Sequence, residues 1–551
     1  MKRIYVFSAS LILVLILIGC KNTPNELNQW EPYNEAFELE DNANHPISRM
    51  QYKRIQSKHS DRNTLFIPFK EELAEFTQAD HDTLMTLILE QDILSLQRSI
   101  AAGALSYETL TLFYLYRIYH YELRRDTFLN AIISLNPNVL IEARAKDRLR
   151  QKELEHPIYG MPVLLKDNIN ALPMVTTAGA AAFSDNVPQS DAFLVKQLKD
   201  KGALVLGKVN LSEWAYYFCQ GCPVGYSAMG GQTLNPYGRR QFETGGSSSG
   251  SGVAVAANYA VAAIGSETSG SILSPSGKNS VVGLKPTIGA VSRSGVVPIS
   301  STLDTAGPMT KNVVDNAILL SGITGLDSKD SYSYASQSIR FQGLDTIQMK
   351  GKRLGLIRNF AKDSLMQVAI KIMEEAGATI ITFDPPEAAL KQFRKILDVD
   401  MKKDLPLYID SHGNRSLGLD SVKDIVAFNK KDSLLHAPYG QGIFERIAQD
   451  TTSAVHFEPT KRKIMQEAMN YFEIPMLQYQ LDVVLSIDNR SASYAAAANY
   501  PALGVPMGYQ ADGQPQNITF IAPSRQEQKL LEIGAAFERL TNARKIPKEY
   551  N

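Results

Sequence analysis

The most restrictive feature of the chain is segment 245–252, which reads GGSSSGSG and continues directly into the apolar run Val253–Ala257. A flexible Gly/Ser linker would be flanked by polar sequence, whereas this segment leads into a pattern typical of a buried helix. Its glycines permit backbone conformations that other residues rarely adopt. The segment is therefore expected to form a tight, ordered turn that presents serine hydroxyls and backbone N–H groups to one point.

A nucleophile elbow is the alternative for the same turn, because residues 246–250 read GSSSG and match the pattern G-x-S-x-G. An elbow requires a buried strand just before its serine. Residues 237–244 contain two arginines, a glycine and a glutamine, which is a poor composition for such a strand. The alternative stays open on the sequence alone.

Two further segments carry the groups that a hydrolytic site needs. Residues 265–272 read GSETSGSI, and Gly270 would let the chain curl so that consecutive N–H groups point to one spot, as an oxyanion hole requires. Residues 160–167 read GMPVLLKD and place Lys166 at the end of an apolar strand. Burial there would lower the pKa of the lysine toward that of a usable base.

Alternation of apolar-periodic helices and short strands predicts an α/β fold for the rest of the chain. Ser106 is expected to cap a helix. The expected segments, in order, are helices within 71–150, a helix and a strand over 193–210, strands at 353–357 and 379–382 around a helix, mainly helical sequence in 383–480, strands within 481–523 and a last helix over 525–543.

These segments, taken in order, resemble the amidase-signature family. The resemblance covers about residues 70–543, interrupted by the motif-free region 320–480. The sequences GLKPT at 283–287 and DTAGPM at 304–309 are especially typical. The matching segments are 160–168, 177–214, 230–289, 295–316 and 501–538. Within the family, SEWA at 212–215, GGQ at 230–232 and NPY at 235–237 look most like the peptide-amidase branch.

The resemblance implies an amidase-signature fold, in which a mixed central β-sheet is covered by helices on both faces. It implies a single domain over residues 66–545. The core of that domain is expected in 150–320 and 481–545, and its variable helical region in 321–480.

The resemblance also implies an amidase that hydrolyses a carboxamide, with a peptide C-terminal amide as the leading candidate substrate and small aryl or acyl amides as alternatives. Ser271 would be the nucleophile that forms an acyl-enzyme. Ser247 would bridge it to Lys166, and the Gly246–Ser247 peptide bond is expected to be cis. Lys166 must be neutral to accept a proton relayed through Ser247.

The oxyanion hole that the resemblance implies consists of the backbone N–H groups of Thr268, Ser269, Gly270 and Ser271. Ser248 and Ser249 would support the network, or simply hold the loop by hydrogen bonds. The family usually has Asp-x-Gly-Gly-Ser at the nucleophile, whereas this chain has ETSGS at 267–271. Glu at the first position is tolerated in the peptide-amidase branch, and Ser269 replaces a Gly or Asp.

Residues 1–20 are expected to be a lipoprotein signal peptide. Two basic residues precede the apolar run 8–18, which is too short for a comfortable membrane span. Gly19 stands before Cys20, an arrangement that resembles the bacterial lipobox, in which the cysteine is lipidated and becomes the new N-terminus. The alternative is an uncleaved anchor helix around an incidental cysteine.

Both alternatives place the remainder of the chain outside the cytoplasm. Residues 21–65 are polar with little periodicity and are expected to form a tether. The expected location is the bacterial cell envelope, with the protein anchored to the membrane through Cys20 and facing the periplasm or the exterior. A cytoplasmic amidotransferase component that works on mischarged tRNA is disfavoured for the same reason.

Composition and missing motifs exclude several other classes. The chain has 57 basic and 57 acidic residues, so no net charge attracts nucleic acid. It has no P-loop, dinucleotide fingerprint or zinc-binding helix motif, so neither a cofactor nor a metal is expected. No obligate protein partner is implied. Cys219 and Cys222 are expected to form a local disulfide or to be inert thiols. A binding lipoprotein that kept the fold without catalysis is the non-enzymatic alternative.

Overall fold

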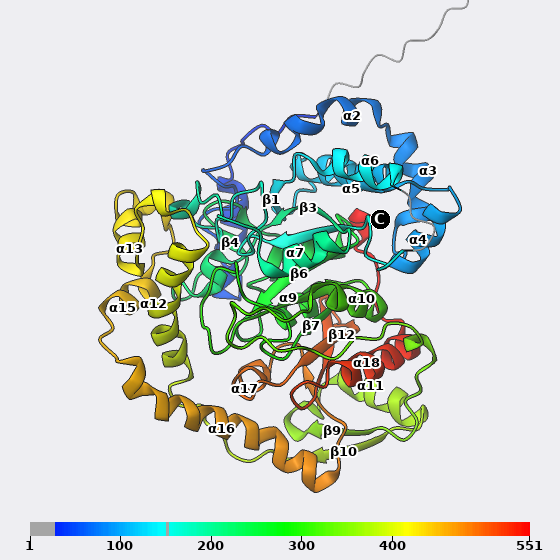
Figure 1. The fold of residues 1–551 in the computed structure, drawn as a ribbon, viewed down its shortest axis with the longest axis vertical. Helices are drawn as coiled ribbons and strands as arrows, with labels where there is room; N and C mark the ends of the chain where they lie inside the picture. Colours follow the sequence, from blue (N-terminus) through cyan, green and yellow to red (C-terminus); the bar gives the residue numbers. More distant parts are fainter. Residues whose placement is uncertain (1–27, 150–153) are drawn as a thin grey trace, which may run out of the picture.

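The computed structural model describes residues 28–149 and 154–551. The expected signal peptide over 1–20 and its lipidation residue, Cys20, lie outside the described residues. The protein is an α/β protein built around one large sheet (Figure 1).

Eleven strands form this mixed sheet, in the spatial order β1-β3-β2-β6-β8-β7-β12-β13-β11-β9-β10. Neighbours are parallel within β3-β2-β6 and within β11-β9-β10, and antiparallel elsewhere. The strands are β1 (Ile132–Leu135), β2 (Pro162–Lys166), β3 (Leu204–Val209), β6 (Ala262–Glu267), β7 (Val282–Lys285), β8 (Thr305–Thr310), β9 (Arg353–Ile357), β10 (Thr379–Phe383), β11 (Val483–Ile487), β12 (Ala502–Tyr509) and β13 (Pro515–Ile521). A separate hairpin pairs β4 (Tyr226–Ser227) with β5 (Gly231–Gln232).

Helices surround the sheet. They are α1 (Ala36–Asn42), α2 (Lys70–Glu75), α3 (Gln78–Ile88), α4 (Ile93–Ala101), α5 (Tyr107–Glu122), α6 (Val139–Arg148), α7 (Phe193–Asp200), α8 (Ser249–Ala256), α9 (Leu273–Lys278), α10 (Val313–Ile323), α11 (Ser364–Glu375), α12 (Phe393–Ser411), α13 (Val422–Lys430), α14 (Ser433–His436), α15 (Gly442–Gln449), α16 (Ala454–Tyr479), α17 (Ala492–Ala497) and α18 (Glu527–Thr541).

Strand β12 shows that helices cover both faces. Successive side chains of a strand point to opposite faces. Leu503 and Val505 point toward Gly534 of α18, whereas a side chain at Gly504 would meet Leu273 of α9. Helices α18 and α9 therefore lie on opposite sides of the sheet, which confirms the predicted fold class.

Most predicted elements are confirmed. The helix and strand expected over 193–210 are α7 and β3, and Ser106 caps α5 by accepting a hydrogen bond from the N–H of Thr109. The strands expected at 353–357 and 379–382 are β9 and β10, which form one edge of the sheet. Strand β1 was missed, because a four-residue strand inside helical sequence carries too little pattern to be recognised.

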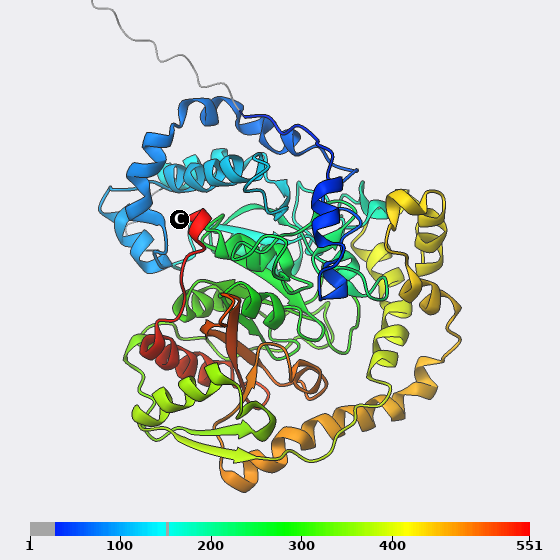
Figure 2. The same cartoon turned by 180° about the vertical axis from the view of Figure 1, so that it is seen from behind.

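The helices α12 to α16 run along one side of the molecule as a yellow-to-orange border in Figure 1, and Figure 2 shows the same arrangement from behind. This arm comes from the motif-free part of the chain. Its longest helix, α16, returns to contact β9 and β11. The motif-free region thus contributes β9 and β10 to the edge of the sheet opposite β1, and its helices α12 to α16 form a lateral layer beside that edge.

The predicted tether over 21–65 is wrong for its described part. Residues 28–65 pack on the domain, where Trp30, Met50 and Ile55 are buried. The carbonyl oxygen of Ile55 accepts hydrogen bonds from the N–H of Gln232, at 2.8 Å, and from Nδ2 of Asn130, at 3.0 Å. Isolated apolar residues in polar sequence carry no periodicity, so this docking could not be read from the pattern. The domain includes these residues and does not begin at residue 66.

Replacing Ile55 with Ala is therefore expected to destabilise the protein by about 2–5 kcal/mol, the usual cost of truncating a fully buried isoleucine. Ile47→Ala provides the control, because Ile47 is exposed and its truncation should change the free energy of unfolding by less than about 0.5 kcal/mol. Urea unfolding of the two variants measures the difference. Equal midpoints would mean that residues 28–65 do not contribute to the folded domain.

Candidate active site

Three of the predicted segments meet at one edge of the sheet. Lys166 is the last residue of β2, and Glu267 is the last residue of its parallel neighbour β6. Parallel strands end at the same edge, where open α/β sheets commonly bind ligands. Helix α8 begins at Ser249, so Ser247 lies just before its first turn, and Ser271 lies just before α9.

The side chain of Lys166 is fully buried and surrounded by serine oxygens. Its Nζ lies 2.8 Å from Oγ of Ser247, 2.9 Å from Oγ of Ser266 and 3.1 Å from the carbonyl oxygen of Ser266. Burial lowers the pKa of Lys166 from 10.5 to about 7, although the carboxylates of Asp304 and Glu267 act in the opposite direction. A neutral amine has two N–H donors and one lone pair. It can therefore donate both bonds to Ser266 and accept the hydroxyl hydrogen of Ser247.

The peptide bond between Gly246 and Ser247 is cis, as predicted. The carbonyl oxygen of Ser247 accepts a hydrogen bond from the N–H of Ser212 at 3.0 Å. The N–H of the next residue, Ser248, donates to the carbonyl oxygen of Ser271 at 3.1 Å. These backbone contacts hold the loops of Ser247 and Ser271 side by side. Within the described chain, the hydroxyl of Ser271 makes no hydrogen bond, and 9% of the residue's surface is exposed.

The loop of Thr268, Ser269, Gly270 and Ser271 has the properties of an anion-binding turn. None of these four N–H groups donates a hydrogen bond to another described residue. Gly270 has a φ of 87°, a left-handed conformation that glycine adopts without strain. Free N–H groups in a tight turn can stabilise a negative oxygen.

Two buried carboxylates shape this turn. One carboxylate oxygen of Glu267 accepts hydrogen bonds from the N–H groups of Ile272, at 2.7 Å, and Leu273, at 3.0 Å. Asp304 accepts the hydroxyl of Thr268 at 2.6 Å. Burial raises the pKa of Asp304 to about 6, and the Thr268 hydroxyl opposes that rise. The side chain of Glu267 thus links the end of β6 to the start of α9 and fixes the path of the turn between them.

Comparison with known proteins identifies the family of this chain. Residues 110–486 match the Amidase protein family. The chain belongs to the amidase family. A probable amidase of Arabidopsis thaliana is 36% identical to it over 450 residues, which cover 77% of this chain and 85% of the relative. The protein is accordingly an enzyme that acts on the C–N bond of amides.

Solved structures of other amidases share the fold. An amidase family protein from Bacillus anthracis has a TM-score of 0.85 at 34% identity, with 90% of this chain and 100% of that chain covered. The native peptide amidase from Stenotrophomonas maltophilia has a TM-score of 0.78 at 39% identity, with 83% and 98% covered. The amidase is thus related to a peptide amidase over most of both chains.

Ser248 and Ser249, predicted to support the site, both bond to backbone. The hydroxyl of Ser248 donates to the carbonyl oxygen of Ser266 at 3.0 Å, and that of Ser249 donates to the carbonyl oxygen of Gly245 at 2.7 Å. The nucleophile-elbow alternative is wrong, because residues 237–244 form turns and no strand precedes the serines in this described segment. The turn begins α8 instead.

Sequence reasoning missed Ser266 and Ser212. Ser266 provides two of the oxygens around the amine of Lys166, and its hydroxyl also accepts a hydrogen bond from Nδ2 of Asn168 at 2.9 Å. Ser212 supports Ser247 through its backbone N–H. The available signal for Ser266 was its place at the end of a strand whose parallel neighbour carries Lys166. For Ser212 the sequence carried no such signal.

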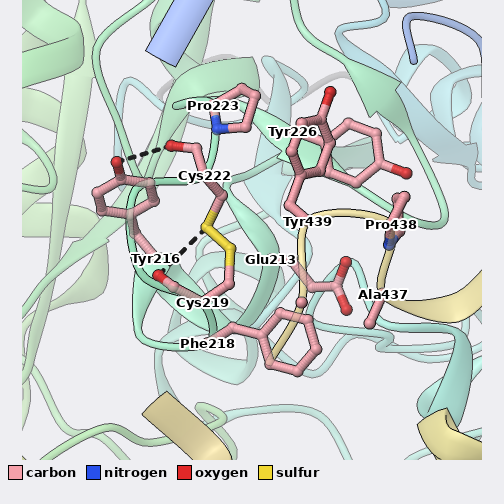
Figure 3. Close-up of a pocket in the computed structure, with 11 residues that line it drawn as sticks. Glu213, Tyr216, Phe218, Cys219, Cys222, Pro223, Tyr226, Ala437, Pro438 and Tyr439 are labelled. Atoms are coloured by element: carbon pink, nitrogen blue, oxygen red, sulfur yellow. Dashed lines mark hydrogen bonds between the residues drawn. A yellow bond between two sulfur atoms is a disulfide. The ribbon is translucent and has the colours of Figure 1, made fainter. Parts of the chain in front are cut away.

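A small cavity of the amidase lies between the loop of residues 213–226 and residues 437–440 (Figure 3). Cys219 and Cys222 line it as a disulfide, one of the two states expected for them. Glu213 also faces it, with one oxygen accepting the N–H of Ala228 and the other unpartnered among described residues. Burial raises the pKa of Glu213 to about 8. None of Lys166, Ser247 and Ser271 lines this cavity.

The lowered pKa of Lys166 predicts a pH dependence of stability relative to Lys166→Met. Between about pH 7 and 10.5 the unfolded chain keeps a proton on Lys166 that the folded state has lost. Burying the charged amine lowers the free energy of unfolding of the wild type, and this destabilisation is complete below about pH 7. It declines as the pH rises, so the free energy of unfolding of the wild type should increase relative to that of the variant by about 1.4 kcal/mol per pH unit. Urea unfolding of both proteins at pH 7, 8 and 9 measures how the difference in their free energies of unfolding changes with pH. Hydrogen bonds lost in the variant shift that difference equally at each pH and so do not affect the change. A difference independent of pH would show that the amine titrates near its ordinary value.

Proposed function

We propose that this amidase hydrolyses a carboxamide through an acyl-enzyme on Ser271, with Ser247 and Lys166 as the proton relay. The observation that carries the proposal is the 2.8 Å contact between the buried amine of Lys166 and the hydroxyl of Ser247. It lies beside a turn whose four N–H groups are free of described partners. A base, a relay and an oxyanion hole are what amide hydrolysis by a serine requires.

In the proposed reaction the oxygen of Ser271 attacks the amide carbon while its proton passes to Ser247, and the proton of Ser247 passes to neutral Lys166. The N–H groups of residues 268–271 stabilise the negative oxygen of the tetrahedral intermediate. The relay then runs in reverse and protonates the leaving nitrogen, which departs as ammonia or an amine. Water hydrolyses the acyl-enzyme by the same route and yields the carboxylate.

A peptide C-terminal amide is the proposed substrate class. Similarity to the Stenotrophomonas maltophilia peptide amidase, at 39% identity, supports it. A glutamyl-tRNA(Gln) amidotransferase chain from Thermotoga maritima is less similar, at 26% identity and a TM-score of 0.60. A bacterial aryl acylamidase is 19% identical and informs on the fold alone. Small aryl or acyl amides are therefore the second choice.

We also propose that the enzyme is a lipoprotein of the bacterial cell envelope, anchored through Cys20. The proposal rests on the basic, apolar and Gly-Cys order of residues 1–20. Across the part of the chain that the structure describes, no helix is both long and apolar enough to span a bilayer.

Labelling with a fluorophosphonate tests the proposed nucleophile. The wild type should gain one adduct on Ser271, detected by intact mass and peptide mapping, and Ser271→Ala and Lys166→Ala should gain none. The labelling rate should rise with pH through about 7, because the relay needs the neutral amine. Ser364→Ala, an exposed serine on α11, is the control and should label like the wild type. An adduct on Ser248, or none at all in the wild type, would refute the mechanism.

Metabolic labelling with an alkyne-tagged palmitate in a bacterial host tests the anchor. The wild type should incorporate the lipid and partition with membranes, whereas Cys20→Ser should do neither, because the acceptor thiol is gone. Cys219→Ser removes a different cysteine and should keep the label. Unlabelled wild-type protein at the membrane would instead favour the uncleaved anchor helix.

A further inference from the structure

Ser269 departs from the usual family pattern, and its hydroxyl contacts α17. Its Oγ lies 3.0 Å from Oγ of Ser493, and both residues are half-buried. Ser269 precedes Ser271 by two residues, so their Cα atoms are at most about 7 Å apart. A substrate whose carbonyl carbon reaches Ser271 therefore passes close to this pair of hydroxyls.

The two hydroxyls have hydrogen-bonding capacity to spare. Each carries one O–H donor and two acceptor lone pairs. Their mutual contact uses one hydrogen and one lone pair, and neither hydroxyl bonds to any other described group. One O–H donor and three lone pairs remain available to another molecule.

Asn489 adds a third neutral group beside them. Its Nδ2 lies 2.8 Å from the point where a Cβ on Gly270 would stand, so its carboxamide covers the turn next to Ser271. The residue is exposed, and its side chain makes no hydrogen bond in the described chain. Like the hydroxyls, a carboxamide both donates and accepts.

The charged groups nearby are mostly engaged. Asp488 accepts the N–H of Asn517 at 2.9 Å and lies 3.8 Å from Lys278. Asp304 accepts the hydroxyl of Thr268. Arg490 is exposed and follows Asn489 directly. Of the groups shown against the turn, Ser493 and Asn489 are neutral and have unused capacity, which matches an uncharged partner that both donates and accepts.

We propose that Ser269, Ser493 and Asn489 form a subsite for the main-chain amide that adjoins the scissile carboxamide. A peptide group offers one neutral N–H and one neutral C=O, the complement of this set. The subsite selects acylated amino-acid amides and peptide amides over simple carboxamides. This inference rests on the proposed function, because it takes Ser271 as the attacking residue.

Two substrates that differ only in that group test the subsite. N-acetylphenylalaninamide and 3-phenylpropanamide share the scissile carboxamide and the phenyl ring, but the second lacks the main-chain amide. The specificity ratio is kcat/KM for the first divided by kcat/KM for the second. Ser493→Ala and Ser269→Ala should each lower this ratio about three- to tenfold, mainly through KM, as expected for one lost neutral hydrogen bond.

Two further variants separate the hydroxyl from the fold. Ser493→Thr keeps the hydroxyl and should keep the ratio within about twofold of the wild type. The double variant should lose less than the product of the single losses, because the two hydroxyls form one unit. Ser364→Ala on α11 is the matched serine control and should leave kcat/KM for both amides unchanged.

An unchanged ratio in both alanine variants would overturn the subsite, as would an equal fall for both amides. A preference for N-succinyl over N-acetyl substrates that disappears in Arg490→Gln would also overturn it, because the partner would then be charged. Failure of the proposed function has a different signature. In that case the wild type would hydrolyse neither amide, and Ser271 would take no fluorophosphonate.

Discussion

The buried amine of Lys166 is the group on which the rest of the candidate active site depends. A lysine nitrogen without exposed surface carries its charge at a high free-energy cost, which lowers its pKa to about 7. Oxygens of Ser247 and Ser266 take the place of water around it. Because the neutral amine has a single lone pair, only one hydroxyl can donate to it. That restriction gives the network a direction, from the hydroxyl of Ser247 toward the lysine, without any ion pair.

The neighbouring carboxylates are placed so that they do not pair with this amine. Glu267 and Asp304 both favour the charged lysine, but desolvation outweighs them. Their oxygens instead accept hydrogen bonds from the backbone and from Thr268, which holds the turn of residues 268–271 in shape. The same acidic residues thus organise free N–H donors without pairing with Lys166. The hydroxyl of Ser269, turned toward Ser493, extends this polar surface outward without adding charge.

Much of the core could be predicted from sequence, because its elements carry strong local signals. Strand β2 is a short apolar run that ends at Lys166. Helix α8 follows a glycine-rich turn that leads directly into apolar sequence, which indicates an ordered turn and not a flexible linker. The docking of residues 28–65 could not be predicted, since Trp30 and Ile55 are isolated apolar residues whose partners lie far along the chain. Strand β1 could not be predicted either, because four residues are too few to show a strand pattern.

The sequence by itself determined the fold class and the family resemblance, and that resemblance implies the roles proposed for Lys166, Ser247 and Ser271, because motifs are made of residue types at local spacings. Only the tertiary structure decided what surrounds them. Ser266, Ser212 and Ser493 lie 100, 46 and 327 residues along the chain from Lys166, and no local pattern shows that they lie near it or near the turn of residues 268–271. They reach the site because the pairing of β2 with β6 and the packing of α17 beside the turn bring distant segments together. Hydrogen-bond partners and desolvation are properties of that three-dimensional neighbourhood, and no periodicity in the chain encodes them directly.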